Sequence, residues 1–160
     1  MDQLLKLLEQ NAKLTNTQLA AILGKSEEEV AAAVAAFERD RVILGYNALV
    51  NWEKTGNDEI TAYIEVKVQP KRDYGYEEIA AEIMRFDEVE TVWLMSSPSY
   101  DLAVMVRGKS FRDVSMFVAH RLATLDSVTS TATHFVLQKY KERGTIMVDA
   151  PKDERRMSQL

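Results

Sequence analysis

Three serines, a tyrosine and an aspartate lie together in residues 96–101, with the sequence Ser-Ser-Pro-Ser-Tyr-Asp, between two strands predicted to be central in a sheet. A carboxylate there can accept charge-assisted hydrogen bonds, and hydroxyls can donate or accept neutral ones. Thr131 and Thr133 stand two apart on a predicted strand and therefore project from the same face. The candidate binding residues are Ser96, Ser97, Ser99, Tyr100, Asp101, Thr131 and Thr133. The alternative is a polar turn, in which Asp101 and the serines close local backbone hydrogen bonds.

No cluster of residues in the sequence indicates catalysis, a metal centre or a cofactor site. The chain has no cysteine, which removes disulfides, thiolate ligands and thiol nucleophiles. Its two histidines, His120 and His134, have neither the spacing nor the carboxylate neighbours of a metal site. The six glycines stand singly, so there is no glycine-rich phosphate loop, and no serine lies in a nucleophile elbow. The glutamates at 27–29 are most simply the acidic first turn of a helix. We therefore expect a protein that is not an enzyme and that binds no metal or cofactor.

Length and composition indicate one globular domain or two small ones. The 160 residues are 46% hydrophobic and 28% charged, with a net charge of −5. A net negative charge does not indicate nucleic-acid binding, which is usually marked by a basic patch. No apolar run approaches the roughly 20 residues of a membrane span, and the charged start is unlike a signal peptide. We expect a cytoplasmic protein with no membrane partner.

Residues 1–51 are predicted to form three helices and a hairpin. Leucines recur with helical spacing in 2–12. The motifs Thr-x-x-Gln at 15–18 and Ser-x-x-Glu at 26–29 are capping boxes that begin a second and a third helix. Only Gly24-Lys25 separates these two helices, which is typical of a helix-turn-helix. A helical hairpin without DNA-binding activity is the alternative.

Two short apolar runs, 42–44 and 48–50, follow the third helix around Gly45-Tyr46-Asn47. They predict a β-hairpin that forms a wing behind the helix-turn-helix. The polar segment 52–59 (WEKTGNDE) is the predicted linker to a second domain.

Residues 60–144 are predicted to form a ferredoxin-like βαββαβ domain, so the fold class of the whole chain is α+β. Hydrophobic alternation, helical periodicity and the strand-ending Pro70 carry this prediction. The predicted elements are strands at 60–69, 89–95, 102–106 and 128–140 and helices at 76–86 and 110–125. Residues 145–160 are expected to add a short edge strand at 145–149 and a polar tail.

Two helices on one face of a four-stranded sheet leave its other face uncovered. Five side chains are expected to add apolar surface there: Trp93, Met95, Met105, Phe135 and Leu137. Exposed patches of this kind mark interfaces, so we expect a homodimer or a larger closed ring. The alternative is that the first domain folds over this face.

Three separated motifs in order give the chain a family resemblance. They are RVILGYNALVN at 41–51, SYDL at 99–102 and VTSTATHFVL at 128–137. From about residue 1 to residue 144 the chain resembles the leucine-responsive/asparagine-regulator (Lrp/AsnC) family, also called feast/famine regulatory proteins. The resemblance implies a winged helix-turn-helix, then a ligand-binding domain known as RAM. It also implies dimers that assemble into octamer-like rings, with a small amino acid bound between subunits.

For an amino-acid effector, Asp101 is the predicted acceptor for the ammonium group, and the serine and threonine hydroxyls are the predicted donors to the carboxylate. The chain departs from the family pattern at Pro98, where the family usually has glycine. Proline has a fixed φ and no N–H, so a pocket that used this backbone amide would lack it here.

The predicted recognition helix is acidic, which is a second departure. Residues 26–40 hold five acidic side chains and one arginine, a net charge of −4. Phosphates favour cations, although glutamate can accept a hydrogen bond from cytosine N4. The candidate DNA-binding residues are Lys13, Asn16, Thr17, Gln18, Lys25, Ser26, Glu28 and Arg39. We expect weak binding of double-stranded DNA per domain.

Two functional hypotheses follow. The first is a transcription regulator of the Lrp/AsnC type that senses an amino acid or a related metabolite as a homo-oligomer. The second is an oligomeric metabolite-sensing or protein-interaction module whose acidic helix-turn-helix no longer binds DNA.

Overall fold

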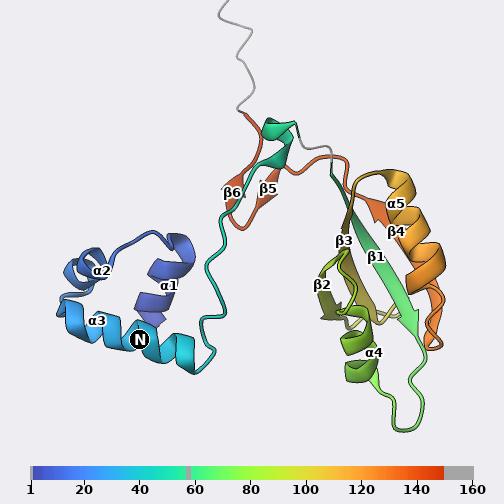
Figure 1. The fold of residues 1–160 in the computed structure, drawn as a ribbon, viewed down its shortest axis with the longest axis horizontal. Helices are drawn as coiled ribbons and strands as arrows, with labels where there is room; N and C mark the ends of the chain where they lie inside the picture. The colour runs from blue at the N-terminus through green and yellow to red at the C-terminus, as the bar shows by residue number, and fades with distance from the viewer. Residues whose placement is uncertain (1, 57–58, 150–160) are drawn as a thin grey trace, which may run out of the picture. The chain divides into compact units, whose positions relative to one another are not determined.

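The computed structural model describes residues 2–56 and 59–149 (Figure 1). The predicted polar tail at 151–160 and residues 57 and 58 of the predicted linker lie outside this part of the chain. The chain divides into two compact units between Val50 and Asn51. Each unit has its own hydrophobic core.

Three helices form the first unit: α1 (Asp2–Gln10), α2 (Asn16–Leu23) and α3 (Glu27–Arg39). One buried apolar cluster joins the three helices. Its buried members are Leu4, Leu8, Leu19, Ala20 and Val30.

The predicted capping boxes at the starts of α2 and α3 are confirmed. The Gln18 N–H donates to Thr15 Oγ1 at 3.2 Å, and the Thr15 N–H donates to Gln18 Oε1 at 2.9 Å. Ser26 and Glu29 exchange the same pair of bonds at the start of α3. Gly24 ends α2 in the left-handed region at φ +65°, where a side chain would be strained. These contacts define a helix-turn-helix with a short connection.

The predicted wing hairpin at 42–50 is wrong, because the structure has no strand in this segment. Leu44 exposes 78% of its surface there. A lone two-stranded hairpin is only marginally stable in water unless another element covers it. The central Gly45-Tyr46-Asn47 also lacks the Asn-Gly or Asp-Gly pair that favours a tight hairpin turn. Tyr46 instead donates a hydrogen bond of 2.9 Å to Glu38 Oε1.

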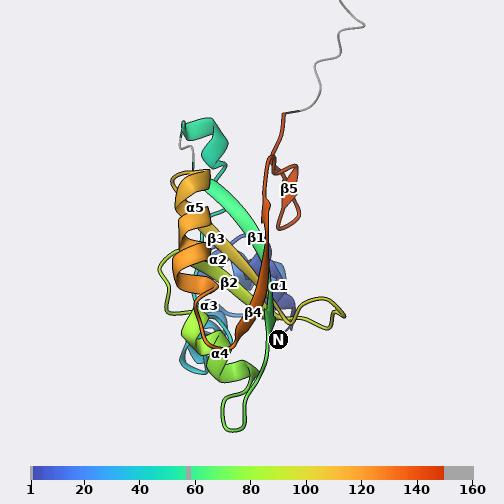
Figure 2. The ribbon, with the colours of Figure 1, turned by 90° about the vertical axis from the view of Figure 1, so that its right-hand side faces the viewer.

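The second unit is built on a four-stranded antiparallel sheet in the order β2-β3-β1-β4. Helices α4 and α5 lie on one side of it (Figure 2). In chain order the elements are β1 (Ile60–Val68), α4 (Tyr76–Ile83), β2 (Val89–Leu94), β3 (Leu102–Gly108), α5 (Phe111–Phe117) and β4 (Val128–Phe135). The element order and the strand order confirm the predicted ferredoxin-like arrangement.

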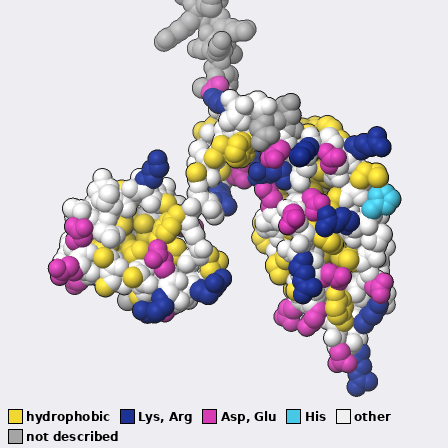
Figure 3. Space-filling view, viewed as in Figure 1, with side chains coloured by type: hydrophobic (Ala, Val, Ile, Leu, Met, Phe, Trp, Pro, Cys, Tyr) yellow, Lys and Arg dark blue, Asp and Glu magenta, His cyan; other side chains and the backbone are white. Residues whose placement is uncertain are grey.

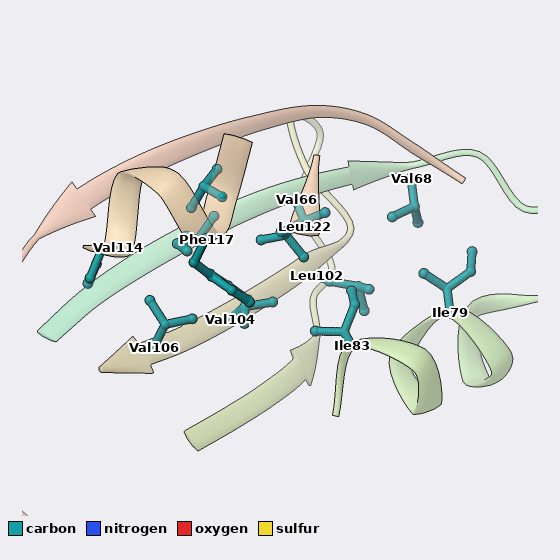
Figure 4. Close-up of a cluster of buried hydrophobic side chains, with 13 residues drawn as sticks. Val66, Val68, Ile79, Ile83, Leu102, Val104, Val106, Val114, Phe117 and Leu122 are labelled. Carbon is teal, nitrogen blue, oxygen red and sulfur yellow. The ribbon is translucent and has the colours of Figure 1, made fainter. Parts of the chain in front are cut away.

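The core of the second unit lies between the sheet and the helices (Figure 4). Ile64 and Val66 of β1 are fully buried there, as the predicted alternation requires, and Ile83 of α4 belongs to the same cluster. The predicted helix at 110–125 is shorter: α5 ends at Phe117 and a π-helical turn, η2 (Val118–Leu122), follows. Leu122 is still fully buried in this turn.

The end of the chain differs most from prediction. β4 ends at Phe135, and the predicted edge strand at 145–149 does not join the sheet. Instead β5 (Lys141–Glu142) and β6 (Thr145–Ile146) pair with each other as a separate hairpin (Figure 1). Arg143 at φ +46° and Gly144 at φ +82° provide the two positive φ angles that a type I′ turn requires. Residues 145–146 therefore pair with residues 141–142 and not with an edge of the four-stranded sheet.

The predicted linker is partly folded. Its first four residues form a 3₁₀ helix, η1 (Trp52–Thr55), which ends at Gly56 with φ +72°. The N-terminal part of the linker thus belongs structurally to the second unit.

Candidate effector loop and nucleic-acid-binding helices

The candidate loop, residues 96–101, connects β2 to β3. The prediction that it joins two central strands is wrong, because β2 is an edge strand of the sheet. The Asp101 N–H donates to the Val66 carbonyl at 3.0 Å, which ties the end of the loop to the middle strand β1.

Asp101 uses both carboxylate oxygens within the chain. Oδ2 accepts a hydrogen bond of 2.9 Å from the Val68 N–H, and Oδ1 accepts one of 3.2 Å from Lys67 Nζ. The Asp101 side chain is only 15% exposed. Both partners lie on β1 rather than within the turn, so the carboxylate ties the loop to the sheet and does not close the local bonds of the polar-turn alternative. An ammonium group that bound Asp101 would have to share it with Lys67 or displace Lys67.

Tyr100 joins the candidate loop to the sheet. Its phenol oxygen lies 2.8 Å from that of Tyr63 on β1. The hydrogen bond with Tyr100, helped by partial burial, raises the pKa of Tyr63 to about 12. The Tyr63 phenol is therefore neutral at pH 7.

The serines of the candidate loop interact mainly with one another. The Ser97 and Ser99 hydroxyls lie 3.2 Å apart, and the Ser99 N–H donates to Ser97 Oγ at 3.3 Å. Ser96 is exposed. The hydroxyls are thus near the surface, where a ligand can reach them.

The predicted threonines lie elsewhere in the same chain. Thr131 pairs with Val66 and Thr133 pairs with Ile64, so both project toward the helix-covered side of the sheet. Leu102, which follows the candidate loop, pairs with Val66 on the opposite edge of β1. Two strand spacings, roughly 10 Å, therefore separate Thr131 from Leu102. One chain alone does not bring the threonines and the loop together.

Sequence reasoning missed Lys67 and Tyr63 as neighbours of the candidate loop. Both occupy the outward positions of the alternating strand β1. Their contacts with Asp101 and Tyr100 depend on the register between β1 and β3, which alternation alone does not specify. The alternation does indicate that each side chain faces away from the helices.

The face of the sheet opposite the helices, here called the open face, carries Tyr63, Trp93 and Met105. Trp93 is 49% exposed. Phe135 was predicted on this face, and that prediction is wrong: Phe135 pairs with Ala62 and packs edge-on against Phe111 on the helix side, with ring centroids 4.7 Å apart. Strand alternation places Phe135 with Thr131 and Thr133, and all three face the helices. Leu137 lies beyond the end of β4.

Half of the candidate DNA-binding side chains already have partners in the first unit. Gln18 and Ser26 belong to the capping boxes described above. Thr17 Oγ1 donates to Glu27 Oε2 at 2.9 Å, and Arg39 forms an ion pair of 2.9 Å with Asp40. The Thr17–Glu27 bond links α2 to α3, whereas the Arg39–Asp40 pair joins two neighbouring residues at the end of α3.

The remaining four candidates are Lys13, Asn16, Lys25 and Glu28, of which all but Asn16 are exposed. Hydrogen bonds from the Ser26 backbone and side chain lower the pKa of Glu29, so this first-turn carboxylate is charged at neutral pH. On the face shown in Figure 3, the acidic side chains of the first unit lie mainly at its left edge, and the basic ones lie at its top, bottom and right, around an apolar centre.

A cavity of about 380 Å³ lies elsewhere in the second unit, between the turn before α4 and the turn before β4. Its lining contains none of the candidate residues and consists of Lys71, Tyr74, Glu82, Thr124, Leu125, Asp126 and Ser127. Within residues 2–56 and 59–149, no three His, Asp or Glu side chains are grouped to hold a metal ion. In the same ranges, no helix has the length and apolar character to cross a membrane.

The fold and the helix-turn-helix define a two-part DNA-binding regulator with a ligand-binding domain. Residues 3–43 match the family model for a winged helix-turn-helix DNA-binding domain, and residues 61–146 match the model for the Lrp/AsnC ligand-binding domain. The chain belongs to the Lrp/AsnC family of transcriptional regulators.

Proteins of similar sequence are named as transcriptional regulators. The chain is 43% identical over 154 residues to the uncharacterized HTH-type transcriptional regulator YugG of Bacillus subtilis, covering 96% of this chain and 92% of that protein. It is 28% identical over 142 residues to the proline dehydrogenase transcriptional activator of Rhizobium radiobacter, covering 89% and 90%.

Solved structures share the fold. Escherichia coli AsnC superposes with a TM-score of 0.69 at 25% identity, covering 91% of this chain and 94% of that one. A feast or famine regulatory protein of Mycobacterium tuberculosis, solved with L-methionine, superposes with a TM-score of 0.72 at 22% identity, covering 91% and 95%.

Proposed function

We propose that this chain regulates transcription by binding double-stranded DNA through α2 and α3, and that an amino acid bound to its second unit changes that binding. The observation that carries the proposal is the doubly capped α2–α3 pair in a chain whose other domain is of the Lrp/AsnC ligand-binding type. We propose no enzymatic activity. A DNA-binding regulator acts where the DNA is, which supports a cytoplasmic location.

The proposed DNA surface is the start of α3 together with the α2–α3 connection, since a recognition helix contacts bases with its N-terminal residues. Lys25 and Glu28 are exposed there and are available for phosphate and base contacts. Because this surface has few basic side chains, the DNA affinity of each domain is low. Several domains on one oligomer raise the overall DNA affinity by avidity.

The proposed effector is an amino acid. Two similar proteins were solved with L-methionine, from Neisseria meningitidis and from Mycobacterium tuberculosis. Because the candidate loop and Thr131 lie about 10 Å apart across β1 in one chain, a pocket that uses both takes the loop from one subunit and the threonines from another. This reasoning supports a site between subunits.

The proposed assembly is a homodimer that builds a larger ring such as an octamer. Met105 and the half-exposed Trp93 lie near each other on the open face and support it, since a contiguous apolar patch on a sheet face marks an interface. A site between subunits requires such an assembly.

Selection from a random duplex pool followed by fluorescence anisotropy tests the DNA-binding part. The selected duplex should bind at least about tenfold more tightly than a scrambled one. Calorimetry with L-methionine and the other common amino acids tests the effector part, and at least one should bind.

The acidic α3 favours a second candidate function, an oligomeric metabolite-sensing module that binds no DNA. Three glutamates occupy the first turn of α3, and Arg39 near its end is paired with Asp40. Amino-acid binding without any selected duplex would support this candidate and would contradict the first.

A further inference from the structure

Three side-chain contacts tie the start of the linker to the end of the chain. Asn51 Nδ2 donates to the Met147 carbonyl at 2.7 Å, and Gln138 Nε2 donates to Glu53 Oε2 at 2.8 Å. Lys54 Nζ and Asp149 Oδ1 form an ion pair of 2.6 Å. We call these contacts between residues 51–54 and residues 138–149 the linker clamp. All of them lie within the second unit.

The side of the clamp formed by residues 138–149 is itself well held. The type I′ turn closes the β5–β6 hairpin, and the Met147 N–H donates to the Tyr140 carbonyl at 2.9 Å. Lys139 and Glu142 add an ion pair of 3.2 Å. The hairpin therefore holds the Met147 carbonyl in place.

The side formed by residues 51–54 depends on the clamp. A four-residue 3₁₀ helix makes few and poorly aligned hydrogen bonds of its own. Within η1 these include the Lys54 N–H to the Asn51 carbonyl at 3.2 Å. The half-buried bond from Asn51 to Met147 is the strongest candidate for an anchor, because exposed ion pairs such as Lys54–Asp149 contribute little.

One side of the clamp follows the DNA-binding unit in the chain, and the other side follows β4. Asn51 directly follows Val50, the last residue of the DNA-binding unit. Gln138 follows β4, the strand that carries Thr131 and Thr133. The Val136 N–H donates to the Thr61 carbonyl at 2.9 Å, so the chain stays attached to the sheet up to the start of the clamp. A shift of β4 therefore moves the linker start with it.

We propose that Asn51, Glu53 and Gln138 are positioning residues that couple effector binding to DNA binding by holding the start of the linker against residues 138–149. This inference rests on the proposed function. The clamp acts through the linker and touches neither DNA nor effector. Its loss leaves both intrinsic affinities in place and removes their interdependence, which is a coupling free energy.

A pair of matched variants tests the Glu53–Gln138 contact. Gln138→Glu sets two carboxylates against each other and breaks it, and the double variant Gln138→Glu/Glu53→Gln restores an amide–carboxylate bond in the opposite sense. In the full-length wild type, the effector found by calorimetry should change the dissociation constant for the selected duplex at least about fivefold. Gln138→Glu should reduce that ratio to below about twofold, and the double variant should recover it. An unchanged ratio in Gln138→Glu, with the effector and DNA affinities of wild type, would overturn the proposal.

Hydrogen exchange tests the clamp independently of the proposed function. Asn51→Asp replaces the donor with an isosteric acceptor that faces the Met147 carbonyl, and Glu9→Gln on α1 is a charge-changing control outside the clamp. Amides of residues 52–55 should exchange at least about tenfold faster in Asn51→Asp, and at the wild-type rate in the control. Equal protection in wild type and Asn51→Asp would overturn the clamp even if neither DNA nor amino acid bound. Failure of wild-type binding alone, with the exchange result intact, would instead contradict the proposed function.

Discussion

The phenol oxygens of Tyr63 and Tyr100 lie 2.8 Å apart, which links the candidate loop to the open face of the sheet. Tyr63 stands on β1 between Met105 of β3 and His134 of β4. A ligand that moved Tyr100 would therefore disturb the face on which the proposed subunit interface lies.

Tyr63→Phe should lower the free energy of unfolding by about 1 kcal/mol, the typical net value of one hydrogen bond. Urea denaturation at pH 7 measures it. The pKa of Tyr63 is raised to about 12 in the folded chain. The stabilisation that its protonated phenol gives the fold is therefore complete below pH 10 and is lost as the pH rises toward 12. The stability of wild type should fall over that range more than the stability of Tyr63→Phe. Parallel pH profiles would show that the pair does not couple the loop to the sheet.

Asp101→Ala should cost about 1–3 kcal/mol of stability, because it leaves the half-buried Val68 N–H without its acceptor. It should also abolish the rise in melting temperature that the effector causes by mass action. Lys67→Gln is the matched control, since it removes the ion pair and keeps the bond to Val68. If the effector binds Asp101→Ala as tightly as wild type, Asp101 serves only the fold.

Trp93→Glu should shift the chain toward smaller oligomers in light scattering, because it buries a charge in the proposed interface on the open face. Met84→Glu, on an exposed side chain after α4, should leave the assembly unchanged. The helix-side packing of Phe135 predicts a different outcome for Phe135→Glu, which is loss of folding stability. A wild-type monomer at micromolar concentration would remove the basis of this prediction.

Glu28→Lys should raise affinity for non-specific DNA and steepen its salt dependence, because it adds a cation at the start of α3. Glu77→Lys makes the same charge change at the start of α4 in the second unit and should have a much smaller effect. Anisotropy titrations at about 50 and about 200 mM salt compare the two. Equal effects would mean that net charge, rather than the α3 surface, controls binding.

Local signals in the sequence predicted the helices and the sheet well. The two capping boxes and Gly24 form by contacts within a few residues, and the alternation of β1 is visible directly in residues 60–68. In β4 the apolar residues do not keep to one face, so the sequence did not show which face meets the helices. Phe135 was therefore assigned to the wrong side, although Thr131 and Thr133 were correctly placed together.

The sequence did not predict the hairpins or the contacts of the candidate loop correctly. The hydrophobic runs at 42–50 indicated a hairpin, but no third strand or helix stabilises one there. The β5–β6 hairpin turns at Arg143-Gly144, which lacks the usual Asn-Gly or Asp-Gly signal. The candidate loop was recognisable from its polar residues, whereas its contacts with Lys67 and Tyr63 follow from the β1–β3 register.

The most direct test of the account is the affinity of the full-length chain for its selected duplex and for a scrambled one, each with and without the amino acid identified by calorimetry. The selected duplex should bind at least about tenfold more tightly than the scrambled one. The amino acid should change the dissociation constant for the selected duplex at least about fivefold. Equal affinity for both duplexes, unaffected by the amino acid, would contradict the account.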